Sequence, residues 1–312
     1  MTTVEQNYER ILVATDFSPH AEAALKQAIW LARLTKAKIT LAHTLPDLRK
    51  VVHQASTLAK LDLLQGEGNQ FDKEVKQKSE AKLRQIVCDL NAGDVQIDYQ
   101  TLLGEAYVEL THYVQGGNFD LVLAGTRGKA AWEQFFVGST AKRLIRKCPA
   151  DVWIVKAEHV GPPQVVLAAT DFSDVSFQAV MRGFQIAQQA NAVFHLLHVI
   201  DSNDVPEDLI EHIPAGSTLR QEIDKEAQKR LQSFLDTLPA DRSRIETHMS
   251  YGTPWMEVGR TAQHLHADLI VMGTIGRGGI KGLLLGNTAE KVLDTCDCSI
   301  LTIKPEGFES PI

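Results

Sequence analysis

The sequence predicts an α/β fold that is present twice in the chain, each copy a parallel sheet covered by helices on both faces. Short apolar runs alternate with longer amphipathic stretches, which is typical of buried parallel strands joined by helices. Residues 11–18 return as residues 165–173, so that Asp16 is matched by Asp171. A glycine pattern, G-x2-G-x9-G, also occurs twice, at the same place relative to each copy. The chain is therefore a tandem duplication.

The length of the chain agrees with two domains. A sequence of 312 residues allows two units of about 150 residues, each large enough to bury a core of its own. The halves meet near Gly161, Pro162 and Pro163, which can neither continue a helix nor pair as a central strand. We expect one domain at residues 1–157 and a second at residues 164–312.

Each half follows the same expected order of elements. A buried strand comes first, at residues 11–15 and 165–170, and a helix follows directly because Ser18 and Ser173 suit an N-cap. The second strand is followed by a long amphipathic helix. The later strands are expected at residues 95–102, 120–124 and 152–156 in the first half and at residues 245–250, 268–272 and 299–304 in the second. The last helices are expected at residues 140–147 and 288–294.

Composition excludes several classes of function. The formal net charge is -7, and basic residues are interspersed with acidic ones, which does not support binding to nucleic acid. The longest apolar runs have the length of strands and residues 1–10 are polar, so no membrane span and no signal peptide are expected. Four cysteines are too few for a disulfide scaffold in so long a chain. We expect a soluble protein of the cytoplasm.

The glycine pattern suits a phosphate group. Gly125 ends an expected strand, and with Gly128 it lets the main chain turn and approach a ligand without a Cβ in the way. Gly138, Ser139 and Thr140 then open a helix, whose free amide groups and positive dipole end favour an anion. This arrangement indicates a site for a polyphosphate at the carboxyl ends of the strands, where ligands of such sheets bind.

The repeated aspartate extends this prediction to a nucleotide. Asp16 and Asp171 follow the first strand of each half, and a carboxylate repels phosphate but accepts hydrogen bonds from ribose hydroxyls or an adenine amino group. A structural alternative stays open for each feature. The glycines can be turn glycines, the Ser139-Thr140 pair can be a helix cap, and the aspartates can form Asx turns that lead into the helix.

Other nucleotide motifs are absent from the sequence. A P-loop needs glycine at Leu123 and Ser or Thr at Ala130, and no G-x-G-x-x-G follows the first strand of either half. Walker-type ATPases and nicotinamide dehydrogenases are therefore disfavoured.

Three motifs together resemble the universal stress protein family, and the duplication resembles its tandem-type members. They are an apolar strand running into Thr-Asp-Phe-Ser, a later strand running into G-x2-G-x9-G-(S/T), and a Cys-Pro-type turn before the last strand. The likeness covers residues 9–305, and residues 286–290 look like the E-type tandem proteins of bacteria. The resemblance implies a five-stranded parallel sheet per domain in order 3-2-1-4-5. It also implies ATP or a related adenine nucleotide in the crevice and dimer-like pairing through the last strands, within the chain or in a homodimer.

The resemblance also implies the binding residues. In the first half these are Thr15, Asp16, Thr44, Gly125, Arg127, Gly128, Gly138, Ser139 and Thr140. In the second half they are Thr170, Asp171, Val199, Gly273, Gly276, Gly286, Asn287 and Thr288. Many ATP-binding members have proline where this chain has Ala14 and Ala169, a change at the adenine wall. Asn287 replaces a hydroxyl residue with a bulkier amide, so the first half is expected to be the stronger site.

Eleven histidines raise the question of a metal site. His195 and His198 lie three apart on an expected strand, which points them to opposite faces. His264 and His266, near a helix end, splay by about 200 degrees if helical. Because no standard zinc spacing is present, no metal site is expected and these histidines are assigned to solvent or to the core.

The expected function is nucleotide binding linked to a stress response, in which occupancy changes the ordering of the phosphate loop and the surface offered to partners. No triad, carboxylate pair or metal centre is visible, so at most slow ATP hydrolysis with bound Mg²⁺ is expected. One rival is a module for another ligand, such as a lipid intermediate or zinc, with the glycine loops kept as scaffold. A second rival is an ATP-consuming transferase or pyrophosphatase, which the lack of a Ser-Gly-Gly loop after the first strand disfavours.

Overall fold

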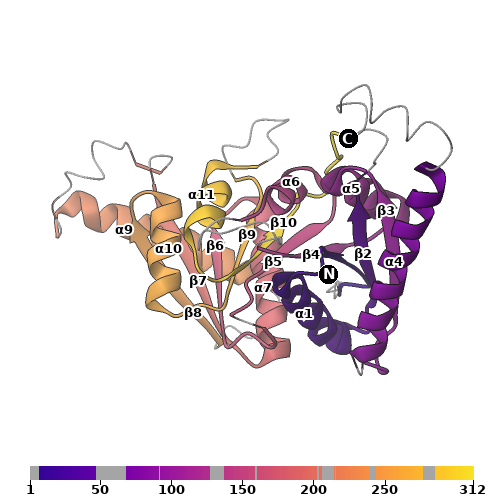
Figure 1. Cartoon of the computed structure of the whole chain (residues 1–312). Helices are drawn as coiled ribbons and strands as arrows, with labels where there is room; N and C mark the ends of the chain where they lie inside the picture. The colour runs from indigo at the N-terminus through magenta and orange to yellow at the C-terminus, as the bar shows by residue number, and fades with distance from the viewer. Residues whose placement is uncertain are drawn as a thin grey trace. The chain divides into compact units, whose positions relative to one another are not determined.

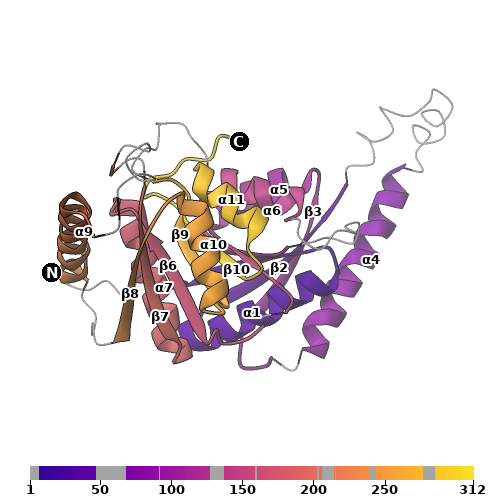
Figure 2. The same cartoon turned by 90° about the vertical axis from the view of Figure 1, so that its left-hand side faces the viewer.

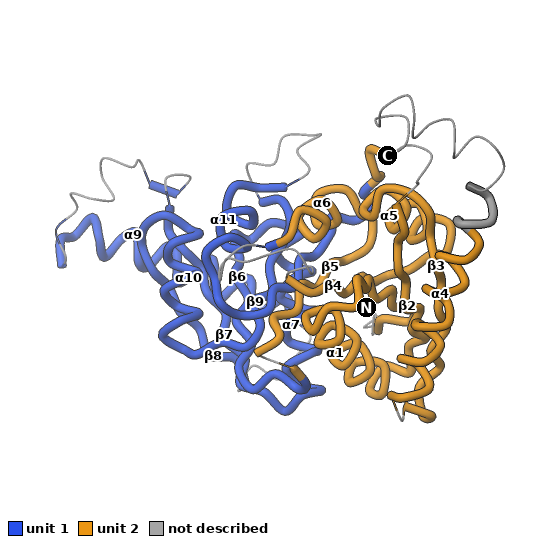
Figure 3. The backbone as a smooth tube through the Cα atoms, viewed as in Figure 1, with its two compact units in different colours: residues 1–6, 133–137, 161–308 blue, residues 7–132, 138–160, 309–312 orange. Residues whose placement is uncertain are grey.

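The computed structural model describes residues 7–46, 68–90, 92–126, 137–158, 160–201, 204–205, 214, 216–238, 244–276 and 285–312. The chain forms two compact units, distinguished by colour in Figure 3. Of the described residues, those in 7–126, 138–160 and 309–312 form the amino-terminal unit, and residue 137 with those in 161–308 forms the carboxy-terminal unit. Each unit is described by itself below.

The amino-terminal unit is a parallel sheet with helices packed against it (Figure 1). Its strands lie in the order β3-β2-β1-β4-β5, and the registered pairs are all parallel. The strands are β1 (Arg10–Thr15), β2 (Lys38–Leu45), β3 (Ile97–Leu103), β4 (Leu121–Gly125) and β5 (Asp151–Val155). The helices are α1 (Pro19–Thr35), α4 (Gly68–Asp89), α5 (Ala106–Gly117) and α6 (Ser139–Lys147).

The carboxy-terminal unit repeats this architecture, as the turned view in Figure 2 also shows. Its strands lie in the order β8-β7-β6-β9-β10, which is again 3-2-1-4-5 within the unit. The strands are β6 (Val165–Thr170), β7 (Val193–Ile200), β8 (Ile245–Tyr251), β9 (Leu269–Gly273) and β10 (Ser299–Ile303). The helices are α7 (Asp174–Ala190), α9 (Thr218–Thr237), α10 (Pro254–His264) and α11 (Asn287–Thr295). The expected fold is confirmed, with element ends within two residues of those expected.

Alternation along β7 shows which helices cover which face of its sheet. Phe194 stacks edge-on with Phe184 of α7, and Ile200 packs with Ala227 of α9, so even-numbered side chains face α7 and α9. The odd-numbered side chains point to the other face, where Leu197 lies in one cavity with residues of α10 and α11. Both faces are therefore buried, as the apolar strand sequences predict.

The helix starts follow from local chemistry. Ser18 and Ser173 are the N-caps of α1 and α7, and their hydroxyls accept hydrogen bonds from the amides of Ala21 and Ser176 at 3.2 and 3.3 Å. Thr253 is the N-cap of α10, but its side chain makes no capping bond. Pro254 is the first residue of that helix and needs no hydrogen-bond acceptor for its amide, because proline has no amide hydrogen.

Within the part of the chain that the structure describes, no helix combines the length and the apolar character needed to span a bilayer.

Candidate functional site

The carboxy-terminal unit contains a cavity of about 290 Å³ at the carboxyl ends of its central strands. Strand order reverses between β6 and β9, because the chain continues from β6 to β7 on one side and reaches β9 on the other. Such a switch point is where open α/β sheets bind ligands. The cavity is lined by Ala169, Thr170, Asp171, Ser176, Leu197, Val199, Asp201, Pro254, Val258, Met272, Gly273, Thr274, Ile275, Gly276, Gly286, Asn287, Thr288 and Ala289. All eight residues expected for the second half are among them.

The turn from β6 into α7 forms one wall of the cavity. Oδ1 of Asp171 accepts hydrogen bonds from the amide and the hydroxyl of Ser173, at 3.1 and 2.6 Å. Thr170 Oγ1 accepts the amide of Phe172 at 3.0 Å. The structural alternative foreseen for this aspartate, an Asx turn, is therefore present. The turn fixes the carboxylate at the cavity wall, so the structural role and a binding role are compatible.

The same turn holds a phenylalanine in a backbone conformation that bulky residues rarely adopt. Phe172 has φ of 63° and its counterpart Phe17 has φ of 65°. Each ring packs on a histidine of the neighbouring strand, Phe172 on His198 and Phe17 on His43, with ring centroids 4.2 and 4.3 Å apart. His43 and His198 thus buttress the same turn in the two units.

Each of these histidines also ties two strands together. Nδ1 of His198 lies 2.9 Å from the carbonyl oxygen of Thr170, and Nδ1 of His43 lies 2.6 Å from that of Thr15. Because a carbonyl only accepts, Nδ1 carries the proton in both rings. The left-handed turn is thus stabilised by ring packing on one side and a hydrogen bond at its first residue.

The start of α11 faces the cavity with glycine at its N-cap. Gly286 has φ of -73° and ψ of 151°, and it makes no side-chain capping bond because it has no side chain. Its own amide donates to the carbonyl of Thr274 at 2.7 Å, which closes the base of the loop between β9 and α11. The first amides of a helix have no partner within it. Asn287, Thr288 and Ala289, the first residues of α11, line the cavity at this end.

The positions of the glycine pattern differ in the physical reason for which they carry glycine. A Cβ on Gly125 would lie 2.6 Å from the backbone carbon of His20, and one on Gly273 would lie 2.8 Å from Val175. These two glycines therefore permit close packing of a strand end on α1 or α7, a role that the sequence analysis did not assign to Gly125. A Cβ on Gly276 would overlap Oδ2 of Asp171.

Gly286 and Gly138 are not required by the fold in this way. Neither has a positive φ, and among the described residues a Cβ on either would lie 3.4 Å from its nearest neighbour, a threonine carbonyl oxygen, which is ordinary contact. The absence of a side chain at these two positions is thus explained by neither backbone conformation nor packing.

Polar and apolar groups divide the remaining wall of the cavity. Leu197, Val199, Val258 and Met272 supply apolar surface, and Asp201 supplies a second carboxylate. Sequence reasoning missed Asp201, although it follows the end of β7 as Asp171 follows β6. It also missed the residues from α10, because a helix that reaches a strand end from elsewhere in the chain leaves no local signal.

The amino-terminal unit places its expected residues in matching positions. Thr15 is the last residue of β1, and Asp16 follows it. Oδ1 of Asp16 accepts a hydrogen bond from the amide of Ser18 at 3.0 Å. Thr44 lies near the end of β2. Gly138 is the N-cap of α6, with Ser139 and Thr140 as its first residues. Helix α6 therefore starts at Ser139, and the Ser139-Thr140 pair does not provide the cap. Arg127 and Gly128 lie outside the described residues.

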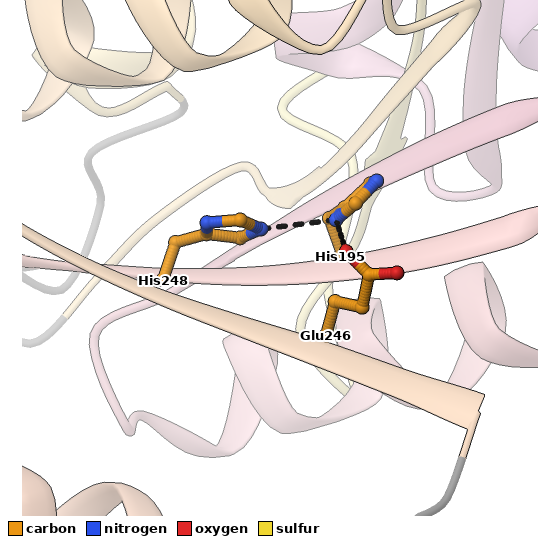
Figure 4. A group of neighbouring side chains, drawn as sticks. All are labelled: His195, Glu246 and His248. Atoms are coloured by element: carbon orange, nitrogen blue, oxygen red, sulfur yellow. Dashed lines mark hydrogen bonds and ion pairs between the residues drawn. The ribbon is translucent and has the colours of Figure 1, made fainter.

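A second group of functional side chains lies on β7 and β8. We expected His195 and His198 to point to opposite faces, and the two rings do not meet. His195 instead lies next to His248 and Glu246 of the neighbouring strand (Figure 4). Its Nδ1 lies 2.9 Å from Nε2 of His248 and 3.3 Å from Oε2 of Glu246. Burial lowers the pKa of His195, which favours its neutral form. Spacing within one strand gave no signal of this group, because it forms across two strands.

Comparison with known proteins assigns the family. The model of the universal stress protein family matches residues 7–156 and again residues 163–304. Universal stress protein E of Photorhabdus laumondii is 28% identical over 326 aligned positions, which cover 98% of each chain. Universal stress protein E of Escherichia coli K12 is 26% identical, with 98% of this chain and 96% of the relative covered.

A solved structure agrees in fold over nearly the whole length. The universal stress protein from Archaeoglobus fulgidus superimposes with a TM-score of 0.67 at 18% identity, covering 95% of this chain and 98% of the other. The family model matches the chain twice, and each match corresponds to a unit of the same topology. The relatives match over nearly their full length. The chain belongs to the universal stress protein family, with two family domains in tandem.

Proposed function

We propose that the cavity of the carboxy-terminal unit binds an adenine nucleotide, with ATP as the reference ligand, and that the amino-terminal unit carries an equivalent site. The observation that carries this proposal is the glycine at the N-cap of α11. Gly286 is needed neither for backbone conformation nor for packing, yet it leaves the first amides of α11 open towards a cavity. A side chain there would stand where a phosphate oxygen meets those amides.

The rest of the cavity suits a nucleoside better than an inorganic anion. Asp171 and Asp201 would repel phosphate placed against them, but carboxylates accept hydrogen bonds from ribose hydroxyls and an adenine amino group. Leu197, Val199 and Met272 offer apolar surface to a flat base. The positive end of α11 and the two carboxylates lie in one cavity, so a ligand with an anionic and a neutral polar part matches both.

The rival ligand, a lipid intermediate, fits the cavity less well. A fatty acyl chain would bring two carboxylates into apolar contact, which is costly without partners. The cavity of about 290 Å³ lies near the lower end of the range for small-molecule sites, about 300 to 1,000 Å³. The same carboxylates are hard oxygen ligands of the kind that Mg²⁺ accepts beside a bound phosphate.

The proposed role is that of a cytoplasmic binding protein in a stress response. Ligand binding between the strand ends and α11 changes the surface that the unit offers to partners. The loop at residues 277–284, whose ordering is expected to change with occupancy, lies outside the described residues. Catalysis is not part of the proposal beyond slow hydrolysis, because no histidine, lysine or cysteine is among the described residues that line the cavity.

The test is calorimetry with ATP and Mg²⁺ on the wild-type chain and on four variants. We expect Gly286→Val and Gly138→Val each to remove one binding event and the double variant to remove both, with affinity at each altered site reduced by more than about 100-fold. Gly93→Val is the matched control, because a Cβ at Gly93 meets nothing within 4 Å. Circular dichroism should show the same fold in every variant.

Two results would contradict the proposal. Retention of ATP binding in the double variant would show that the N-caps of α6 and α11 are not the phosphate sites. A freshly purified wild-type chain that binds no ATP and releases a lipid in mass spectrometry would favour the rival ligand.

A further inference from the structure

Three metal-ligating side chains come together away from the nucleotide cavity. His195 lies on β7, and Glu246 and His248 lie on β8, with one ligand atom of each within 4.8 Å of the others. In Figure 4 the ring of His248 points at that of His195, and the carboxylate of Glu246 approaches the same ring. No other group of this kind is found within the described residues.

The strand register brings these side chains to one face. His195 is paired with Glu246, and Leu197 is paired with His248, in the parallel ladder between β7 and β8. Positions 195 and 197 share one face of β7, and their partners share the same face of β8. All three ligands therefore project towards the side of the sheet that α10 and α11 cover.

Solvent reaches this group from one side only. The side chain of His195 is 7% exposed, whereas that of Glu246 is 64% exposed. His248 lies between these extremes. A bound ion would thus lie between a buried imidazole and an exposed carboxylate.

The fold does not need histidines at these positions. The amino-terminal unit has the same register, in which Thr40 pairs with Asp98 and Ala42 pairs with Gln100. Thr40, Asp98 and Gln100 thus hold the places of His195, Glu246 and His248 in an identical topology. Two histidines facing each other are therefore an added feature of the carboxy-terminal unit and not a requirement of strand packing.

We propose that His195, Glu246 and His248 bind a divalent transition metal ion, with Zn²⁺ as the reference ion. Two imidazoles and one carboxylate are a common ligand set for zinc, and water would fill the fourth position of a tetrahedral site. The measured separations of 2.9 and 3.3 Å between the ligand atoms are close to the spacing of ligands that share one ion at about 2.0 to 2.2 Å.

Binding exchanges one interaction for another without any redox step. In the metal-free protein a single proton bridges Nδ1 of His195 and Nε2 of His248, because two bare nitrogens at 2.9 Å would repel. The ion takes the lone pairs of both nitrogens and of Oε2 of Glu246, and the bridging proton goes to the other nitrogen of a ring or to solvent. The ion then joins β7 to β8 at His195, two residues before Leu197 on the same strand. Leu197 lines the proposed nucleotide cavity.

The test is competition between the untagged protein and a chromophoric chelator for Zn²⁺. Every sample carries Cys88→Ser, because Cys88 is an exposed thiol and binds zinc on its own. The test variants take the residues of the other unit, His195→Thr and His248→Gln, which strand packing tolerates in that unit. His264→Gln, a change at an exposed histidine outside the group, is the matched control.

We expect one tight Zn²⁺ per chain in the reference protein and in His264→Gln, and an affinity at least about 100-fold weaker in His195→Thr and in His248→Gln. Zn²⁺ should raise the melting temperature of the first two proteins only. Co²⁺ should give the strong visible absorption of a four-coordinate site in the reference protein and lose it in His248→Gln. Equal Zn²⁺ affinity in the reference protein and His248→Gln, or no tight Zn²⁺ in the reference protein, would overturn the proposal.

Discussion

The two units of this chain have one topology but differ in the side chains at their strand ends. Both have the order 3-2-1-4-5, and both have an Asx turn and a left-handed phenylalanine packed on a histidine. In contrast, Asp201 of the carboxy-terminal cavity is matched by Pro46, and Asn287 by Ser139. The cross-strand histidine group is present in one unit and absent at the matched positions of the other.

This comparison separates scaffold from specific chemistry. Some features that occur twice, such as Gly125 and Gly273 against the first helix of each unit, are explained by packing, whereas the N-cap glycines Gly138 and Gly286 are not. Features that occur once, such as His195 facing His248, are explained by no requirement of the fold. The duplicated chain thus provides its own control, because one unit shows what the topology accepts without a given side chain.

The largest expected effect comes from moving the histidine group into the other unit. Thr40→His, Asp98→Glu and Gln100→His together place the same three ligands on β2 and β3, in the same register. We expect the stoichiometry to rise from one to two Zn²⁺ per chain, measured by competition with a chelator and by Co²⁺ absorption. An unchanged stoichiometry would show that the carboxy-terminal site depends on more than its three ligands.

A loss of stability is expected when a packing glycine receives a methyl group. Gly125→Ala places a Cβ 2.6 Å from the backbone of His20, so we expect a decrease of about 1 to 3 kcal/mol in the free energy of unfolding. Gly138→Ala meets its nearest described atom at 3.4 Å and loses only the N-cap preference for glycine, so that free energy should fall by less than about 1 kcal/mol. Urea unfolding of the ligand-free chain measures both. Equal losses would contradict the distinction between the two glycines.

The buttressing histidines should differ in their contribution to stability. His198 is 1% exposed, so His198→Ala leaves the buried carbonyl of Thr170 without its hydrogen-bond donor. We expect the free energy of unfolding to fall by about 1 to 3 kcal/mol. His43 is partly exposed, and water can replace its bond to Thr15, so His43→Ala should cost less. Urea unfolding decides the order, and a larger loss for His43→Ala would contradict this account of the two turns.

The smallest expected effects concern the helix caps. Ser18→Ala and Ser173→Ala each remove one capping bond and should each lower the free energy of unfolding by about 1 kcal/mol. Replacement of either serine by glycine is the control, since glycine at an N-cap costs only a few tenths of a kcal/mol. Equal thermal stability of Ser18→Ala and wild type would exclude this role for Ser18.

Much of the fold was predictable because its signals are local. Apolar strands, serine caps and the repeat predicted every strand and its order of appearance, and the ends differ by at most two residues. The candidate site was predictable where it follows a strand end directly, as at Asp171 and Gly273. Asp201 carries the same signal, because it directly follows β7, and was missed. Pro254 and Val258 could not be predicted in this way, because the fold alone brings α10 to this cavity.

The sequence by itself determined that the chain is a duplicated α/β protein, since periodicity and repetition are properties of the order of residues. The tertiary structure decided which glycines serve packing and which leave a helix start open, because that depends on the atoms opposite each Cα. It also decided that His195 meets His248, which lies 53 positions away. Strand register, and not sequence spacing, sets which side chains of two neighbouring strands share a face.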